Sequence, residues 1–335
     1  MIKKIIFLSF VLFSTMVTFS QESKFSTEEI SVNALIPGTL YTPNTSKKTD
    51  LIILIAGSGP TDRNGNQPGV SNNSLKFLAE GLAKNNYAVY NYDKRPVVEM
   101  RSGEIDESKL SFDILIQDVK DIVSYFKAKK QFNKIVIAGH SEGSLIGMNA
   151  ALPDANAFIS LAGAGRPIDE ILIEQIGSRA PMLKEETVKG LESLKKGQTF
   201  ELKNPMLASL FRASVQPYII SWLKHNPQEE IKKLQIPILI VNGTKDIQIS
   251  TQDAELLHKA NPKSELVLIQ NMNHIFKEIK GDDAENMATY TNPNLPVMPE
   301  LIEKITTFLK KILFFLKKNG ESVTKNQFGE PIGIK

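Results

Sequence analysis

The segment KIVIAGHSEGSLIGM, residues 134–148, carries the strongest structural signal in this 335-residue sequence. It begins with a β-branched apolar run, which predicts a buried strand, and from Ser144 it has the pattern of a helix. The sequence Gly-His-Ser-Glu-Gly at 139–143 falls between the two, where G-x-S-x-G predicts a nucleophile elbow. In such an elbow a strained backbone exposes the serine hydroxyl, here that of Ser141, and glycines prevent collisions with strand and helix. The alternative is an ordinary strand-to-helix turn capped by a serine.

The rest of the chain repeats this alternation of strand and helix. Further apolar runs predict strands at residues 51–56, 87–92, 157–161, 236–241 and 265–269. Helical spacing occurs at residues 74–84, 111–129, 144–152 and 251–260. Several strands are continuously apolar, so we predict an α/β fold with a mainly parallel sheet covered on both faces. An antiparallel hairpin over residues 28–43, with Pro37-Gly38 as its turn, is predicted at one edge.

One region interrupts the alternation. Residues 166–233 have helical patterns, no clear strand and the only tryptophan, Trp222, which predicts a helical cap inserted between two strands. Residues 301–315 predict a closing helix, and a polar tail follows from about residue 318. We therefore expect a single domain over residues 21–335. A composition of 41% hydrophobic and 23% charged residues is typical of a globular chain that can form such a core.

A serine nucleophile needs a histidine base and a carboxylate that orients the histidine, expected in the chain order serine, acid, histidine. Asp246 lies in the loop after the strand predicted at 236–241, and His274 lies in the loop after the next strand. Both loops are expected at the same edge of the sheet as the elbow. We therefore predict Ser141 as nucleophile, His274 as general base and Asp246 as orienting acid.

Other histidines and aspartates fit these roles less well. The remaining histidines are His140 in the elbow, His225 in the predicted cap and His258 in a predicted helix. The rival carboxylates are Asp253, Asp282 and Asp283. We interpret the histidines as structural, and none of the rival carboxylates directly follows a strand.

The loop GSGPTDRNGN, residues 57–66, follows the strand at 51–56 and is rich in small residues that let a backbone approach a substrate. We predict that the backbone N–H groups of Ser58 and Glu142 form an oxyanion hole, with Gly59 as the alternative to Ser58. A glycine-rich loop can also bind phosphate. This loop lacks both the Gly-Lys-Ser/Thr ending and the G-x-G-x-x-G spacing of nucleotide-binding loops.

Residues 1–20 have the composition of a secretory signal peptide, with Lys3 and Lys4 before a mostly apolar run. Cleavage before Gln21 would yield a periplasmic or secreted protein without a membrane span, and the alternative is an uncleaved anchor. The chain has no cysteine, which excludes disulfides and thiolate metal sites. Its formal net charge of +3 does not point to nucleic acid binding.

Together these motifs resemble the α/β-hydrolase superfamily, and more narrowly bacterial serine esterases with a G-S-G-P-x-D-R-x-G-N loop. The matching segments are 57–66, 92–95 (YDKR), 139–143 and 162–167, with Asp246 and His274. The resemblance implies about eight strands, a helical cap, no cofactor and ester hydrolysis through an acyl-enzyme. Relatives usually continue YDKR with Gly-x-Gly-x-Ser, whereas PVVEM follows here at 96–100, which leaves substrate size open.

Four charged residues accompany the oxyanion loop: Asp62, Arg63, Asp93 and Arg95. They could bind substrate charges. Charges in loops at a sheet edge more often pair with one another and brace the loop, and this is the interpretation that we favour.

The sequence thus predicts a carboxylesterase-like serine hydrolase that acts on a small-molecule ester. One alternative keeps the catalytic residues and changes the substrate to a thioester or a peptide N-terminus, as in serine aminopeptidases. A peptidase would need a carboxylate in the cap, such as Glu170, Glu174 or Glu229. A further alternative is a binding protein that has the fold without the catalysis.

Overall fold

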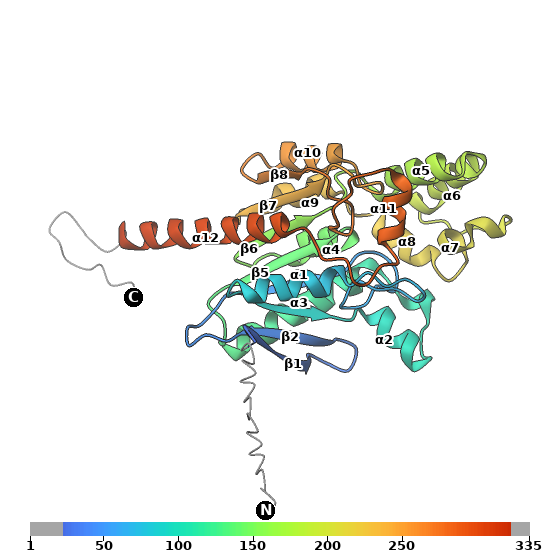
Figure 1. Ribbon diagram of the computed structural model, residues 1–335. Coiled ribbons are helices and arrows are strands. Elements are labelled where there is room, and N and C mark those ends of the chain that lie inside the picture. The colour runs from blue at the N-terminus through green and yellow to red at the C-terminus, as the bar shows by residue number, and fades with distance from the viewer. Residues whose placement is uncertain (1–22, 323–335) are drawn as a thin grey trace, which may run out of the picture.

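The computed structural model describes residues 23–322, and side chains of its last helix up to Ile312. The predicted signal peptide, residues 1–20, lies outside the described residues. Eight strands form one sheet in the order β1-β2-β4-β3-β5-β6-β7-β8 (Figure 1). Within residues 23–322, no helix combines the length and the apolarity needed to cross a membrane.

Most of the sheet is parallel. The strands are β1 Phe25–Ser31, β2 Pro37–Pro43, β3 Leu51–Ile55, β4 Ala88–Tyr92, β5 Ile135–His140, β6 Ala157–Leu161, β7 Ile238–Gly243 and β8 Glu265–Ile269. Strands β3 to β8 pair in parallel, and the β1–β2 hairpin joins β4 antiparallel. The predicted α/β fold with a mainly parallel sheet is confirmed.

Helices cover both faces of the sheet, as expected for buried parallel strands. One face packs against α1 Ser74–Lys84 and α12 Pro299–Ser322. The other face packs against α3 Phe112–Lys129, α4 Glu142–Ala150, α9 Pro227–Lys233 and α10 Thr251–Ala260. Side chains along β3 alternate between the two cores, Leu51 and Ile53 facing one and Ile52 and Leu54 the other. The continuous apolar run of β3 is thus explained by burial on both faces.

The edge hairpin turns before the predicted position. Residues 32–36 form the turn, which is closed by hydrogen bonds from Val32 N to Ile36 O at 3.1 Å and from Ile36 N to Asn33 O at 3.2 Å. Pro37 and Gly38 instead begin β2. Proline is tolerated at the first position of a strand, and a Cβ at Gly38 would lie 2.5 Å from the Tyr90 ring. The prediction of a Pro-Gly turn was wrong because packing against Tyr90, rather than a turn, requires this glycine.

Two helix boundaries also differ from expectation, and a helix is present where none was predicted. Helix α4 begins at Glu142, directly after Ser141, and not at Ser144. Helix α12 continues to Ser322, past the predicted end at residue 315 and into the predicted polar tail. Lysines are good helix formers, so polarity alone does not end the helix. Helix α2 Arg95–Ser102, which contains the PVVEM segment, was not predicted.

Four helices between β6 and β7 pack around a small core of their own. They are α5 Ile168–Arg179, α6 Lys184–Lys195, α7 Ala208–Phe211 and α8 Gln216–Trp222, and we call them the helical insertion. Their core includes Leu191, Leu194 and Phe211. Figure 1 shows them grouped at one end of the sheet. Helix α9, which the sequence assigned to the same region, packs through Ile231 into the core beneath the sheet.

Candidate active site

Ser141 lies on a sharp turn between β5 and α4. Its backbone has φ 55° and ψ −120°, a combination that costs energy for any residue with a side chain. A Cβ on Gly139 would lie 2.1 Å from the Gly143 carbonyl oxygen, and a Cβ on Gly143 would lie 2.6 Å from that of Ile55. Only glycine fits on either side of the turn, so these residues fold into the strained geometry expected of a nucleophile elbow.

Asp246 and His274 lie together at the carboxyl ends of β7 and β8. His274 Nδ1 is 2.8 Å from Asp246 Oδ2, and the two side chains are only 4% and 0% exposed. The other carboxylate oxygen of Asp246 accepts hydrogen bonds from Gln248 N at 2.8 Å and Ile249 N at 2.9 Å. These bonds fix the carboxylate in its loop and leave Oδ2 for the histidine.

The Asp246 bond also determines which nitrogen of His274 can act as a base. A carboxylate oxygen only accepts, so Nδ1 carries the proton and Nε2 is left with a free lone pair. The loop that holds His274 is fixed by its neighbour Asn273, whose Oδ1 accepts from Ile275 N at 3.1 Å and from Lys277 N at 2.8 Å. The imidazole is thereby held in one orientation and one tautomer.

Ser141 and His274 line one cavity of about 160 Å³, which we call the polar cavity. Its wall also includes Thr61, Gln67, Asn72, Ser74, Gln248 and Tyr290. Within residues 23–322, no hydrogen bond joins the Ser141 hydroxyl to the His274 ring. Catalytic hydrogen bonds of this kind are often long before a substrate binds. The structure thus places the predicted nucleophile, base and acid at one site.

His140 supports His274 from behind. Its Nε2 lies 2.9 Å from the His274 carbonyl oxygen, which can only accept, so Nε2 is the protonated nitrogen. Burial, with a smaller contribution from His274, lowers the pKa of His140 to about 3, and the ring is neutral at neutral pH. These contacts agree with the prediction that His140 has a structural role. His225 and His258 pair with Asp113 and Ser264 and do not line the polar cavity.

The two residues predicted to supply the oxyanion donors lie close to Ser141. Ser58, Ser141 and Glu142 line a small cavity together, and a Cβ on Gly57 would lie 3.3 Å from Ser141 Cβ, so the oxyanion loop passes directly beside the nucleophile. Among the described residues, neither the Ser58 N–H nor the Glu142 N–H has a hydrogen-bond acceptor. Both groups are therefore available to a substrate oxygen.

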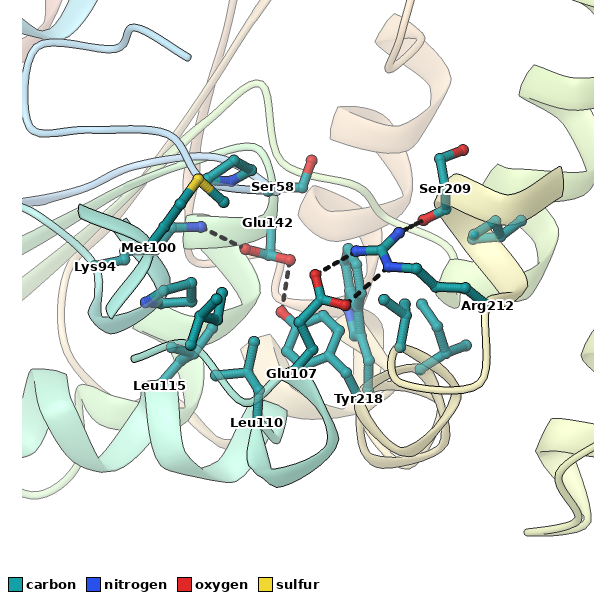
Figure 2. Close-up of a pocket in the computed structure, with 18 residues that line it drawn as sticks. Ser58, Lys94, Met100, Glu107, Leu110, Leu115, Glu142, Ser209, Arg212 and Tyr218 are labelled. Carbon is teal, nitrogen blue, oxygen red and sulfur yellow. Dashed lines mark hydrogen bonds and ion pairs between the residues drawn. The ribbon is translucent and has the colours of Figure 1, made fainter. Parts of the chain in front are cut away.

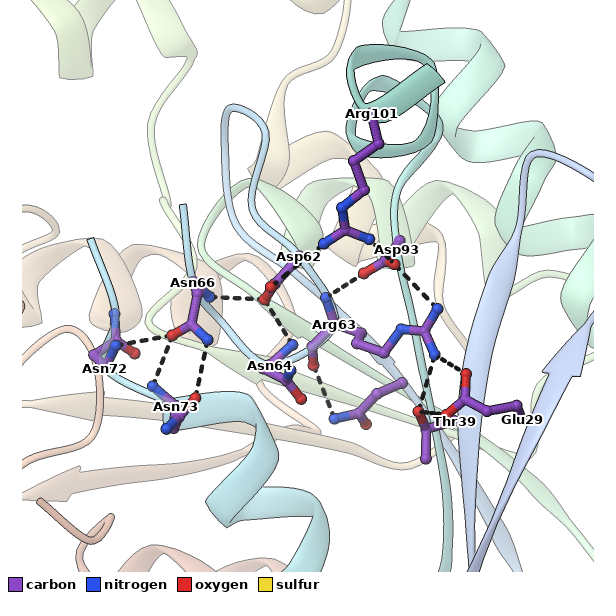
Figure 3. Close-up of polar contacts among 11 residues, drawn as sticks. Glu29, Thr39, Asp62, Arg63, Asn64, Asn66, Asn72, Asn73, Asp93 and Arg101 are labelled. Atoms are coloured by element: carbon purple, nitrogen blue, oxygen red, sulfur yellow. Dashed lines mark hydrogen bonds and ion pairs between the residues drawn. The ribbon is translucent and has the colours of Figure 1, made fainter. Parts of the chain in front are cut away.

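Three of the four predicted supporting charges brace the oxyanion loop (Figure 3). Asp93, which is buried, accepts from the backbone N–H of Arg63 at 2.8 Å and from its guanidinium at 3.0 Å. Asp62 Oδ1 accepts from the backbone N–H groups of Asn64 and Asn66, both at 2.9 Å. Burial alone would raise the pKa of Asp93, but its bonds with Arg63 and Arg101 lower it below the ordinary value.

Arg95 has a different partner. Its guanidinium donates to Asp118 on α3, from Nε at 3.2 Å and from NH2 at 2.5 Å. It therefore anchors the start of α2 to α3 and makes no contact with the oxyanion loop charges. The prediction grouped it with Asp93 because the two residues are close in sequence, although their side chains have separate partners.

A second cavity, of about 200 Å³, has Ser58 in its wall, as the polar cavity does (Figure 2). We call it the apolar cavity because most of its wall is hydrophobic. Its lining includes Met100, Leu110, Leu115, Val215, Ile219 and Trp222. Ser58 and Glu142 line it as well. Two charged residues of the wall, Arg212 and Glu107, form an ion pair, with Arg212 Nε 2.8 Å from Glu107 Oε2. The helical insertion thus forms much of this cavity.

Comparison with known proteins agrees with this architecture. The family model BD-FAE matches residues 39–260. The chain belongs to the BD-FAE family. Esterase EstD of Thermotoga maritima is 25% identical over 302 residues, which cover 86% of this chain and 68% of the relative. This BD-FAE member is a carboxylesterase-like hydrolase of the α/β-hydrolase type.

Solved structures show the same fold. Est1E from Butyrivibrio proteoclasticus superposes with a TM-score of 0.54 at 18% identity, covering 86% of this chain and 98% of Est1E. The Pyrococcus furiosus esterase Pf2001 gives a TM-score of 0.51 at 13% identity, covering 86% and 91%. At these identities the two structures bear on the fold of the BD-FAE chain alone.

Two polar side chains of this BD-FAE member were not singled out from the sequence. Lys94 and Tyr218 both contact the Glu142 carboxylate, Lys94 Nζ at 2.9 Å and the Tyr218 hydroxyl at 2.7 Å. Lys94 lies within the YDKR segment, yet a lysine after a strand is usually exposed.

Within residues 23–322, no group of three or more His, Cys, Asp or Glu side chains is arranged to hold a metal ion.

Proposed function

We propose that this protein hydrolyses carboxylic esters through an acyl-enzyme, with Ser141, His274 and Asp246 as nucleophile, base and orienting acid. The observation that carries the proposal is the buried 2.8 Å contact between His274 and Asp246 on the wall that also holds Ser141. Membership of the BD-FAE family and the likeness to esterase EstD support the same class of reaction.

Each proton has an assigned place in this reaction. His274 Nε2 accepts the proton of Ser141 as the serine oxygen bonds to the acyl carbon, and the N–H groups of Ser58 and Glu142 donate to the developing oxyanion. The His274 imidazolium, stabilised by Asp246, then protonates the alcohol oxygen as the ester C–O bond breaks. Water repeats these steps on the acyl-enzyme, releases the carboxylic acid and restores the Ser141 hydroxyl.

The two cavities suggest how an ester is oriented. The leaving alcohol must lie within reach of His274, which lines the polar cavity. The acyl group then extends past the oxyanion donors Ser58 and Glu142 towards the apolar cavity. We therefore propose an ester of a compact apolar acid with a polar alcohol, such as a hydroxylated one. The Est1E protein has been solved with ferulic acid bound, so an ester of an aromatic acid belongs in the substrate panel.

The Ser141→Ala variant tests the proposal. Turnover of an activated acetyl ester should fall by at least about 10⁴-fold, because the covalent step is removed. Labelling by a fluorophosphonate probe, mapped by mass spectrometry, should occur at Ser141 in the parent protein and be absent from the variant. A variant that keeps parental turnover would overturn the assignment.

The other functions considered from the sequence receive less support. Glu174, one of the carboxylates that could hold a peptide N-terminus, is paired with Arg166, and none of Glu170, Glu174 and Glu229 lines the polar or the apolar cavity. Matched ester, thioester and amino-acid amide substrates would distinguish these activities. A protein without catalysis would fail to react with the fluorophosphonate probe.

We also propose that residues 1–20 direct export and that the helical insertion acts as a cap over the site. The basic start and apolar run of residues 1–20 support the first proposal. The N-terminal sequence of protein recovered from the producing cells would test it, because cleavage before Gln21 leaves a defined new terminus. Retention of residues 1–20 would favour the anchor.

A further inference from the structure

Lys94 is a fully buried lysine next to the nucleophile. It follows β4 and its side chain is 2% exposed. Its Nζ donates to the carbonyl oxygen of Gly57 and lies 2.9 Å from Glu142 Oε2, whose side chain is also 2% exposed. Glu142 Oε1 accepts from the Tyr218 hydroxyl of α8 at 2.7 Å (Figure 2). One ammonium group thus joins the oxyanion loop, the elbow and, through Glu142, the helical insertion.

Each partner of Lys94 is directly connected to one of the predicted oxyanion donors. The Gly57 carbonyl and the Ser58 N–H are the two ends of one planar peptide group, so a bond that fixes the carbonyl also fixes the N–H direction. A cation on the carbonyl also polarises that peptide and strengthens the N–H as a donor. The second donor is the backbone N–H of Glu142, the residue whose carboxylate Lys94 holds.

A purely stabilising role explains this arrangement poorly. Burying an ammonium and a carboxylate has a large desolvation cost, and well-packed apolar replacements are often as stable as the ion pair. The charged pair instead gives the loop and the elbow one fixed separation, because each Lys94 contact has a defined length and direction. An oxyanion hole requires donors in fixed positions, because such donors do not have to reorganise during the reaction.

We propose that Lys94 is a positioning residue that holds both oxyanion donors, Ser58 N–H and Glu142 N–H, in register with Ser141. The role rests on the proposed ester hydrolysis. Lys94 acts through the Gly57 peptide and Glu142 and does not touch the substrate oxygen. Its loss should therefore weaken binding of the transition state much more than binding of the ester itself.

The test compares Lys94→Met with Tyr90→Phe on an activated acetyl ester. Tyr90 is the control because it is also buried and its hydroxyl also donates to backbone carbonyls, those of Ile30 at 3.0 Å and Ile36 at 3.2 Å, away from both cavities. In Lys94→Met, kcat should fall about 100-fold with KM within about twofold, the loss typical of a disturbed oxyanion donor. Affinity for a trifluoromethyl ketone, which forms an oxyanion on Ser141, should fall in parallel. Tyr90→Phe should keep parental kcat.

A second variant removes the dependence on folding of Lys94→Met. Tyr218→Phe keeps the ion pair and removes one bond to Glu142, so kcat on the acetyl ester should fall about two- to tenfold, less than the full value of a hydrogen bond to a charged group because Lys94 still holds the carboxylate. Parental kcat in folded Lys94→Met, or in Tyr218→Phe if Lys94→Met does not fold, overturns the inference. A loss confined to KM also overturns it. Failure of the proposed function itself is separate, because it would appear as activity retained by Ser141→Ala.

Discussion

The polar and apolar cavities, which share Ser58 in their walls, are built from different parts of the chain. The polar cavity is formed by loops at the edge of the sheet, those that follow β3, β7 and β8, and it contains His274. The apolar cavity is formed largely by α2, the segment between α2 and α3, and the helical insertion, and it contains no part of the Asp246–His274 pair. Under the proposed mechanism, residues at the sheet edge would transfer protons and residues of the helices would recognise the acid, so that one could change without the other.

The largest expected effect tests the chemistry of the polar side. Asp246→Asn keeps the shape of the side chain, but Gln248 N and Ile249 N hold the amide oxygen, so the amide NH2 faces His274 Nδ1 and favours the wrong tautomer. We therefore expect kcat to fall about 10⁴-fold on every ester. Steady-state kinetics on small and bulky esters would measure this. Asp283→Asn, an exposed acid on α11 Asp283–Thr289, is the control and should have parental activity. A loss limited to one acid or one alcohol would contradict the division between the two cavities.

A smaller and selective effect is expected on the apolar side. Val215 lines the apolar cavity and is half-buried, so Val215→Phe should reduce the space for an acyl group. We expect kcat/KM to fall about 10- to 100-fold for esters of bulky acids and to change little for acetyl esters. The matched control is Val98→Phe on α2, which lies outside this cavity. An equal loss on acetyl and bulky esters would show that the variant disturbs the catalytic residues instead.

The comparison also bears on what the sequence could predict. The elbow and its proposed partners could be predicted because their signals are local: glycines around Ser141, and an acid and a histidine that each follow an apolar strand. The mainly parallel sheet followed from the same strands. Such signals define the sheet edge and therefore the polar side of the site.

Long-range contacts explain what the sequence did not predict. Lys94 meets Gly57 and Glu142, which lie 37 and 48 positions away, and nothing near Lys94 in the chain indicates this burial. Arg95 selects Asp118 on α3 rather than its neighbour Asp93. Pro37-Gly38 has the composition of a turn but serves close packing against Tyr90. In each case a partner from another element of the fold decides the role.

We expect His140 to make the stability of the folded protein depend on pH. Burial first, and then His274, lowers its pKa from 6.5 to about 3, so the unfolded chain binds a proton between these pH values and the folded protein does not. The wild-type protein should therefore lose stability as pH falls below 6.5, by about 2 kcal/mol at pH 5 from this residue. Gln can donate to the His274 carbonyl without titrating. The difference in unfolding free energy between wild type and His140→Gln should narrow by that amount from pH 8 to pH 5.

Urea unfolding at the two pH values would measure this difference. Other groups titrate in the same range, but their contributions cancel when both proteins are compared at each pH. His258→Gln, a histidine substitution outside the polar cavity, is measured alongside as the control. A constant difference between wild type and His140→Gln would mean that the His140 ring takes up a proton as readily when folded as when unfolded.

The smallest expected effect concerns the alcohol. The Tyr290 hydroxyl accepts from Gln248 Nε2 at 3.0 Å, and both residues line the polar cavity. Tyr290→Phe removes this hydroxyl, so kcat/KM for an ester of a hydroxylated alcohol should fall about two- to tenfold, the value of one hydrogen bond, while the matching ethyl ester is unaffected. Tyr125→Phe, on α3 outside both cavities, is the control. If Tyr290→Phe instead discriminates between acids, and Val215→Phe between alcohols, then the ester binds in the reverse orientation and the acid occupies the polar cavity.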